Sequence, residues 1–297
     1  MNATQFEFWN RTLGWSVFAI ALVTFGLTVE PTASFWDASE YIATSAKLQV
    51  GHPPGAPFYQ MMGAFFSLFA SGPEQIALLV NLMSVFSSAF TILFLFWTLT
   101  LLLKKLPAFS TLKTTNDALA FFGSAVIGAL AFCFSDSFWF NAVEAEVYAM
   151  ATCILSLLFW LSLRWEQEMN TPRGDRWLLL IAFVIGLSFG VHFMGLLTIP
   201  AMGMIYYFKN NKYSHLGALK AFVVSSVILV VIQGILIPKT ASIMGYFDRI
   251  FVNNFNLPFN SIKLFKLSKF IILWWAKRES NSHFLRNTIL SRARLPV

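Results

Sequence analysis

The sequence is poor in charged residues and in cysteine. Of its 297 residues only 12% are charged, whereas 57% are hydrophobic and 33 are phenylalanine. A chain of this composition could not stay soluble as one globular domain. The two cysteines, Cys133 and Cys153, give neither a metal-ligand spacing nor a disulfide framework, and we expect them to pack in apolar spans. No glycine-rich phosphate loop followed by lysine is present, so a cytosolic nucleotide site is not indicated.

Long apolar runs dominate the chain. A helix needs about 20 mainly apolar residues to cross a bilayer. The sequence therefore predicts an all-α, polytopic transmembrane protein with about seven spans, near residues 13–30, 76–103, 118–135, 147–163, 177–191, 194–208 and 221–237. The fifth and sixth spans have a second interpretation. Gly190, His192 and Gly195 interrupt that apolar stretch and could make it a broken or re-entrant pair.

The distribution of basic residues predicts the orientation in the membrane. Lys and Arg that flank spans stay in the cytoplasm. With the N-terminus inside, most of them fall on the cytoplasmic side. Eight carboxylates fall on the outer side: Glu30, Asp37, Glu40, Glu74, Asp136, Glu144, Glu146 and Asp248. We therefore expect an extracytoplasmic site.

The net charge of +7 does not indicate a nucleic-acid partner. Residues 1–262 carry 13 basic and 13 acidic side chains, whereas residues 263–297 carry eight basic and one acidic side chain. We expect residues 1–262 to form the membrane domain. Residues 263–297 are expected to be an atypical basic tail that interrupts the natural sequence. The alternative is a cytoplasmic basic tail. However, seven spans that start from a cytoplasmic N-terminus would place this tail outside the cell, against the rule that basic residues stay in the cytoplasm.

The first outer loop, residues 31–75, holds two carboxylates in a predicted short helix. Ser34 followed by Asp37 is similar to a capping box, and a glycine and two prolines end a helix expected over residues 35–50. One face of this helix carries Asp37, Glu40, Tyr41 and Thr44. Asp37 could act as a general base, since the helix dipole favours its ionised form. It could equally only cap the helix, with Glu40 in solvent.

A rigid turn follows, Gly51-His52-Pro53-Pro54-Gly55. Proline fixes its own φ and restricts the residue before it, so His52 has little conformational freedom. A histidine there could bind a phosphate or pass a proton. The alternative is a turn histidine with one backbone hydrogen bond.

The second outer loop, residues 135–146, places further acids before the fourth span. If the segment is helical, one face carries Asn141, Glu144 and Tyr148, and Glu146 points elsewhere, so one glutamate is aimed at the interior. The alternative is an interfacial helix start with acids near its N-terminus. His192 follows the fifth span. It is either a residue of the site or a polar group whose hydrogen bonds are satisfied within a helix break. Together these residues predict one acidic, histidine-containing cavity at the outer face.

The motifs and their order resemble a known family. Over roughly residues 10–260, the chain resembles the membrane glycosyltransferases of the GT-C superfamily. The resemblance rests on three motifs in this order: Trp36-Asp37-x-x-Glu40, His52-Pro53-Pro54-Gly55 and Glu144-x-Glu146-x-Tyr148. The match is to the bacterial domain-of-unknown-function family 2723, also called glycosyltransferase family 117. That family is related to animal protein O-mannosyltransferases. Its members usually run well beyond 297 residues, so the chain looks truncated.

The resemblance implies a function. A sugar, with mannose as the candidate, would pass from a polyprenyl-phosphate carrier to a Ser or Thr hydroxyl of an exported protein, at a bacterial inner membrane. Asp37 would be the catalytic base and Glu40 its partner. The expected substrate-binding residues are His52, Glu144, Glu146, Tyr148 and His192. The only expected cofactor is the polyprenyl-phosphate sugar that serves as donor, and no residue is assigned as a metal ligand. Participation of a divalent cation is left as an alternative.

Other functions are compatible with the same residues. A lipid or solute transporter could use the acids and histidines as a relay, but its groups should lie near the bilayer midplane. A metal-dependent hydrolase has suitable ligand types without a compact ligand motif. A non-catalytic scaffold would tolerate a neutral residue at position 37. An inactive fragment is the remaining alternative.

Overall fold

The computed structural model describes residues 1–53, 55–256 and 258, and all regular secondary structure in them is helical. These residues belong to two compact units. The first contains residues 1–49 and 56–225, and the second contains residues 50–55 and the residues from 226 onward. The expected tail, residues 263–297, and the domain boundary at residue 262 lie outside the described residues.

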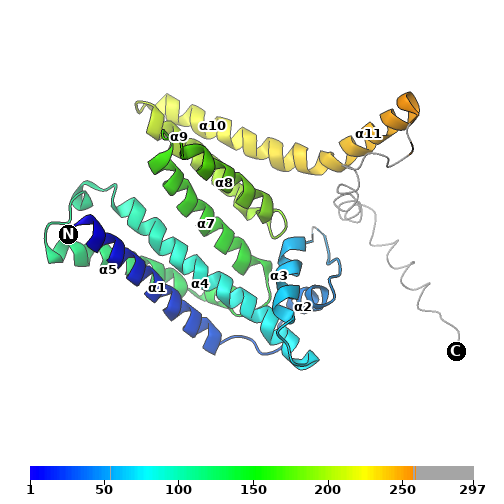
Figure 1. Cartoon of the computed structure of the whole chain (residues 1–297), viewed down its shortest axis with the longest axis horizontal. Coiled ribbons are helices and arrows are strands. Elements are labelled where there is room, and N and C mark those ends of the chain that lie inside the picture. The colour runs from blue at the N-terminus through cyan, green and yellow to red at the C-terminus, as the bar shows by residue number, and fades with distance from the viewer. Residues whose placement is uncertain (54, 257, 259–297) are drawn as a thin grey trace. The chain divides into compact units, whose positions relative to one another are not determined.

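Four long helices form the centre of the first unit. They are α1 (Ala3–Leu27), α4 (Ile76–Leu103), α5 (Thr115–Cys133) and α7 (Val147–Glu168). Figure 1 shows α1 and α7 on either side of α4, and α4 also packs against α5. Each helix coincides with an apolar run, and α4 buries the most side chains because it is surrounded by the other three.

Capping boxes begin two of these helices. The Asn2 side chain accepts from the Gln5 N–H, and the Gln5 side chain accepts from the Asn2 N–H. Thr114 and Asp117 form the same reciprocal pair at the start of α5. Such pairs satisfy N–H groups that have no partner within the helix.

Five helical segments are long and apolar enough to cross a membrane. They are α1, α5, α7, the segment Pro73–Leu103 that contains α4, and the segment His215–Lys239. The last one joins α10 (His215–Val231) to α11 (Ile237–Phe255) through a π-helical turn. The prediction of an all-α polytopic membrane protein is confirmed.

The expected fifth and sixth spans are a pair of short helices. α8 (Gly174–Ser188) has 15 residues and α9 (Thr198–Asn210) has 13, and a 3₁₀ turn, η3 (Phe193–Leu197), precedes α9. Neither reaches the roughly 20 residues that a full span needs. The structure therefore has the broken pair rather than two full spans at residues 177–208.

The break after α8 holds a short helix of the first loop, α3 (Pro57–Ser67). The Gly190 carbonyl accepts hydrogen bonds from the N–H groups of Phe58 (2.8 Å) and Tyr59 (3.1 Å). A Cβ at position 190 would lie 2.6 Å from the Phe58 Cβ. Glycine is needed here because the backbone of α3 approaches so closely.

Two further short helices lie in the outer loops, α2 (Ala38–Ala46) and α6 (Asp136–Ala142). The helix expected over residues 35–50 is shorter than predicted. Ser34 does not cap it, because its hydroxyl bonds elsewhere, as described below. α2 packs against α3, with the Tyr41 and Tyr59 rings in an edge contact at 5.2 Å.

Candidate functional site

One end of the four-helix centre carries both expected loops. α1 and α5 end there, and α4 and α7 begin there. The Glu30 N–H donates to the Val143 carbonyl (3.0 Å), and the Trp139 indole N–H donates to the Thr28 hydroxyl (3.0 Å). The loop after α1 and the loop before α7 are therefore joined directly.

Asn81 fixes the beginning of the first loop. Its side chain is fully buried near the start of α4, and its Nδ2 donates to the carbonyls of Glu30 (2.6 Å) and Thr32 (2.8 Å). Sequence reasoning did not identify this residue. The available signal was an amide side chain inside the strongly apolar run over residues 76–103.

Asp37 stands at the N-cap position of α2 without capping it. Its side chain makes no capping hydrogen bond, and the residue is exposed. The preceding Trp36 has a φ of 58°, in the left-handed region that bulky residues rarely adopt. Such a conformation costs on the order of 1–3 kcal/mol and is concentrated at functional sites. The interpretation of Asp37 as only a helix cap is thus not supported.

Both glutamates of the second loop are buried. Glu144 is 4% exposed and Glu146 is 7% exposed. The prediction that only one points inward is wrong, because α6 ends at Ala142 and the chain then turns, with the Glu146 N–H donating to the Glu144 carbonyl (2.9 Å). The Ser34 hydroxyl donates to Glu144 Oε2 at 2.6 Å.

Glu146 lies beside the start of α2. Burial raises the pKa of its carboxyl to about 7, with the carboxylates of Asp37 and Glu144 adding to the shift and the nearby backbone N–H groups of Val147 and Asp37 opposing it. The site therefore combines an exposed carboxylate with a buried one that titrates near neutrality.

Tyr41 lies among these acids. It is buried, and burial together with the carboxylates of Glu146, Asp37 and Glu40 raises its pKa well above the ordinary value. Tyr41 is thus a neutral phenol that can donate a hydrogen bond. The predicted shared face of α2 has Tyr41 and Thr44 buried and Glu40 half-buried.

His192 meets the site through Tyr148. Their ring centroids are 5.5 Å apart, and Tyr148 is exposed. His192 Nδ1 accepts from the Met194 N–H (3.2 Å), and burial lowers the pKa of the imidazole. The neutral ring then carries its proton on Nε2. His192 makes the backbone hydrogen bond expected of a helix break and also lies beside a predicted site residue.

His52 belongs to the second unit. Its carbonyl accepts from the Gly55 N–H (2.8 Å), which closes the predicted turn. Its position beside the acids stays a prediction. In the described part of the chain, no group of three or more His, Cys, Asp or Glu side chains is arranged to hold a metal ion.

The fold and the site define a class of protein: an all-helical membrane protein with an acidic site built at one end of its helices by two loops. A family model described as "Protein O-mannosyl-transferase TMEM260 N-terminal domain" matches residues 37–215, and the chain belongs to this family. The match contains all seven residues predicted for the site. It confirms the expected relation to protein O-mannosyltransferases of the GT-C type.

Two curated relatives carry the same name. Protein O-mannosyl-transferase TMEM260 of Mus musculus is 27% identical over 174 residues, 58% of this chain and 22% of that protein. Protein O-mannosyl-transferase tmem260 of Dictyostelium discoideum is 24% identical over 162 residues, 54% of this chain and 18% of that protein. The chain thus aligns with about a fifth of the length of either relative. No solved structure matches.

Proposed function

We propose that this chain provides the catalytic membrane region of a glycosyltransferase. It would transfer a sugar, with mannose as the candidate, from a polyprenyl-phosphate carrier to a Ser or Thr hydroxyl of an exported protein. The family membership and the names of the relatives support this proposal. The single observation that carries it is the direct connection between the two acidic loops, in which the Ser34 hydroxyl donates a hydrogen bond to the buried Glu144 carboxylate at 2.6 Å.

Asp37 is the proposed general base. It is exposed at the start of α2, so an acceptor hydroxyl can approach its carboxylate from solvent. In the proposed step the carboxylate takes the proton of the acceptor hydroxyl while that oxygen attacks the anomeric carbon. The bond from this carbon to the carrier phosphate breaks, and the phosphate leaves with the electron pair. A single displacement of this kind inverts the anomeric configuration.

The buried groups have supporting roles in this proposal. Buried Glu146 is proposed to help to position the start of α2, where Asp37 stands. Glu40, half-buried on α2, is the proposed partner of Asp37. Tyr148 and neutral His192 offer hydrogen-bond donors to the sugar or the phosphate, and His52 is proposed to bind the phosphate. No step is assigned to a metal ion.

The acids support an enzyme more than a transporter. A transporter places its binding groups near the bilayer midplane, on broken helices. The α8–α9 pair is broken, but the carboxylates of Asp37, Glu144 and Glu146 lie in loops at the ends of the long helices. The outer face of a bacterial inner membrane stays the predicted location of this site.

The test compares cells that carry the native locus with cells that carry Asp37→Asn at equal protein level in the membrane. Exported proteins are analysed by intact mass and glycan staining, and the released sugar is identified. We expect a loss on the order of 10²-fold or more, the usual effect of removing a general base.

Asp136→Asn is the matched control, because Asp136 is an exposed acid in the second outer loop. This variant should retain the sugar mass. Normal transfer by Asp37→Asn would contradict the assignment of the base. Absence of any sugar mass in wild-type cells that express the protein would contradict glycosyl transfer itself, and transport assays would follow.

A further inference from the structure

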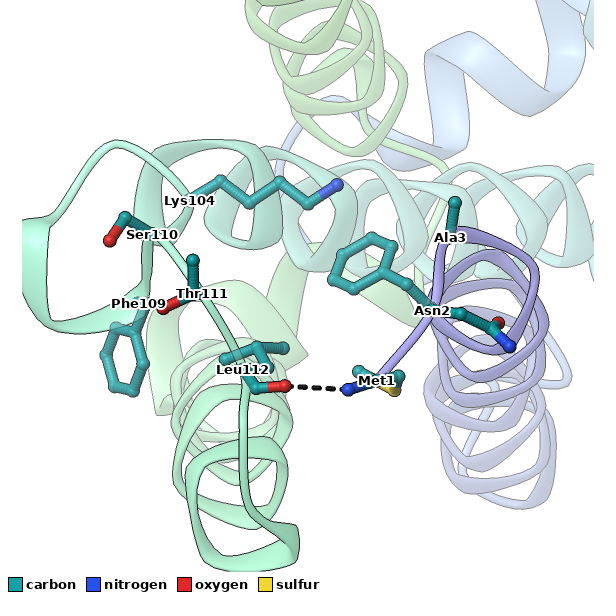
Figure 2. Close-up of a pocket in the computed structure, with 9 residues that line it drawn as sticks. Met1, Asn2, Ala3, Lys104, Phe109, Ser110, Thr111 and Leu112 are labelled. Atoms are coloured by element: carbon teal, nitrogen blue, oxygen red, sulfur yellow. Dashed lines mark hydrogen bonds between the residues drawn. The ribbon is translucent and has the colours of Figure 1, made fainter.

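A cavity lies at the opposite end of the first unit from the acidic site. Its volume is ≈ 420 Å³, within the range of small-molecule sites and larger than one ion requires. The start of α1, the end of α4 and the connection between α4 and α5, including the 3₁₀ turn η2 (Pro107–Phe109), surround it. Figure 2 shows Lys104 extending into this space from the end of α4.

The Lys104 ammonium group is available for an anion. It lies 3.5 Å from the centroid of the Phe6 ring, and within the described residues no carboxylate is at ion-pairing distance from it. Burial lowers the pKa of Lys104, which Glu7 opposes and Arg164 reinforces. An anion in the cavity would stabilise the charged ammonium group and so raise the pKa of Lys104 again. The adjacent Lys105, in contrast, is already paired with Glu166.

The other cavity walls are of two kinds. Phe6, Phe109 and Leu112 give an apolar side, and Thr111 gives a hydroxyl that makes no hydrogen bond with the described residues. The Met1 amine is already engaged with the Leu112 carbonyl at 2.7 Å, as Figure 2 shows. A ligand that fits both kinds of wall carries a negative group joined to an apolar part.

We propose that this cavity binds the phosphate headgroup of an anionic glycerophospholipid from the inner leaflet. Lys104 contacts the phosphate, Thr111 donates a hydrogen bond to it, and the apolar wall covers the glycerol and the first part of an acyl chain. Basic pockets between membrane helices on the cytoplasmic side are suited to such headgroups. The end of the bundle that holds this cavity also carries Arg11, Lys105, Lys113 and Arg164, the basic residues expected in the cytoplasm.

Such a lipid would hold α1 against α4 and the α4–α5 connection. This site is separate from the acidic site, and the proposal does not depend on glycosyl transfer. Its test therefore measures binding and not activity.

The experiment uses the full chain in detergent. Native mass spectrometry follows titration with dioctanoyl phosphatidylglycerol, dioctanoyl phosphatidylcholine or inorganic phosphate. Wild-type protein should retain one phosphatidylglycerol with a several-fold higher affinity than phosphatidylcholine, because the choline cation offsets the negative charge that attracts Lys104 and the basic residues around it, at about 1 kcal/mol per Lys or Arg. Lys104→Gln should lose about tenfold in affinity for phosphatidylglycerol. Lys105→Gln, the matched control, should keep its affinity for phosphatidylglycerol nearly unchanged, because Lys105 is paired with Glu166 and does not line the cavity.

A second variant distinguishes binding in the cavity from a general attraction of the lipid to the basic surface. Thr111→Trp fills the cavity without changing any charge and should also abolish retention. Equal losses in Lys104→Gln and Lys105→Gln, or normal retention by Thr111→Trp, would overturn the site. Equal affinity for the zwitterionic lipid would do the same. Binding of inorganic phosphate as tight as that of the lipid would replace the lipid assignment with a soluble phosphate compound.

Discussion

The Ser34 hydroxyl donates a hydrogen bond to the buried Glu144 carboxylate at 2.6 Å, between residues 110 positions apart in the sequence. This bond connects the loop before α2 to the turn before α7. It also satisfies one oxygen of a carboxylate that is only 4% exposed. The relative position of the two acidic loops therefore depends on a serine that takes no part in the proposed chemistry.

Ser34→Ala should weaken the site and the fold together. Removing a hydrogen bond to a charged group costs about 1.5–3 kcal/mol, and here it leaves a buried carboxylate oxygen without this donor. We expect a lower thermal unfolding temperature in detergent and a smaller fraction of exported protein that carries the sugar. Ser137→Ala, in the exposed part of α6, is the matched control and should behave as wild type. Equal unfolding temperatures for the two variants would contradict this role of Ser34.

Glu146 predicts a pH dependence of stability. Its pKa is about 7 in the folded protein, above the ordinary 4.5, so between these values the folded state holds a proton that the unfolded state has released. The stabilising contribution is full below about pH 4.5 and is lost as the pH rises to about 7. Thermal unfolding measured across this range should show falling stability in wild type.

Glu146→Gln removes this titration, so the decline between pH 4.5 and about 7 should be smaller than in wild type. Glu74→Gln serves as the comparison, because Glu74 is an exposed acid of the first loop. It should keep the wild-type slope. Identical slopes in all three proteins would show that Glu146 is ionised throughout this range.

Asn81→Ala should release the start of the first loop. The variant loses hydrogen bonds to two backbone carbonyls, those of Glu30 and Thr32, in a buried position. We expect a destabilisation of about 1–3 kcal/mol, measured by denaturation in micelles, and reduced sugar transfer. Asn116→Ala, at an exposed position of α5, should leave both quantities unchanged. An unaffected Asn81→Ala protein would mean that other contacts hold the loop.

Gly190→Ala should displace α3. The added Cβ would lie 2.6 Å from the Phe58 Cβ and 3.1 Å from its backbone nitrogen, and the backbone of a helix cannot yield as a flexible side chain can. Overpacking of this kind costs about 1–3 kcal/mol. Gly186→Ala is the matched control in α8, where a Cβ meets nothing within 4 Å. It should be neutral or slightly stabilising, because alanine favours helix. Equal stability of the two variants would contradict a close approach at Gly190.

The sequence predicts the long helices well because their signal is local. Five apolar runs appear as helices of sufficient length for a membrane. The proximity of Asp37 and Glu146 was also predictable, since each lies at a helix end that the alternating direction of the spans brings to one side. A membrane-spanning helix is marked by its long apolar run, which is visible in the sequence.

Other features depend on distant partners. Burial of both Glu144 and Glu146 follows from the end of α6 at Ala142, and no local pattern marks this end. The bonds from Ser34 to Glu144 and from the Gly190 carbonyl to α3 join segments more than 100 residues apart. Spacing along one helix or loop carries no information about such partners. The shortness of α8 and α9 was indicated by glycines, but their exact ends were not.

Asp37 is exposed, and its side chain neither caps α2 nor belongs to the buried core. Substitutions there should leave synthesis and membrane insertion normal. Surveys that rank natural variants by burial, or screens that score protein abundance, would then class a change at this position as harmless. Only an assay of the transferred sugar would then distinguish cells that carry such a variant from wild-type cells.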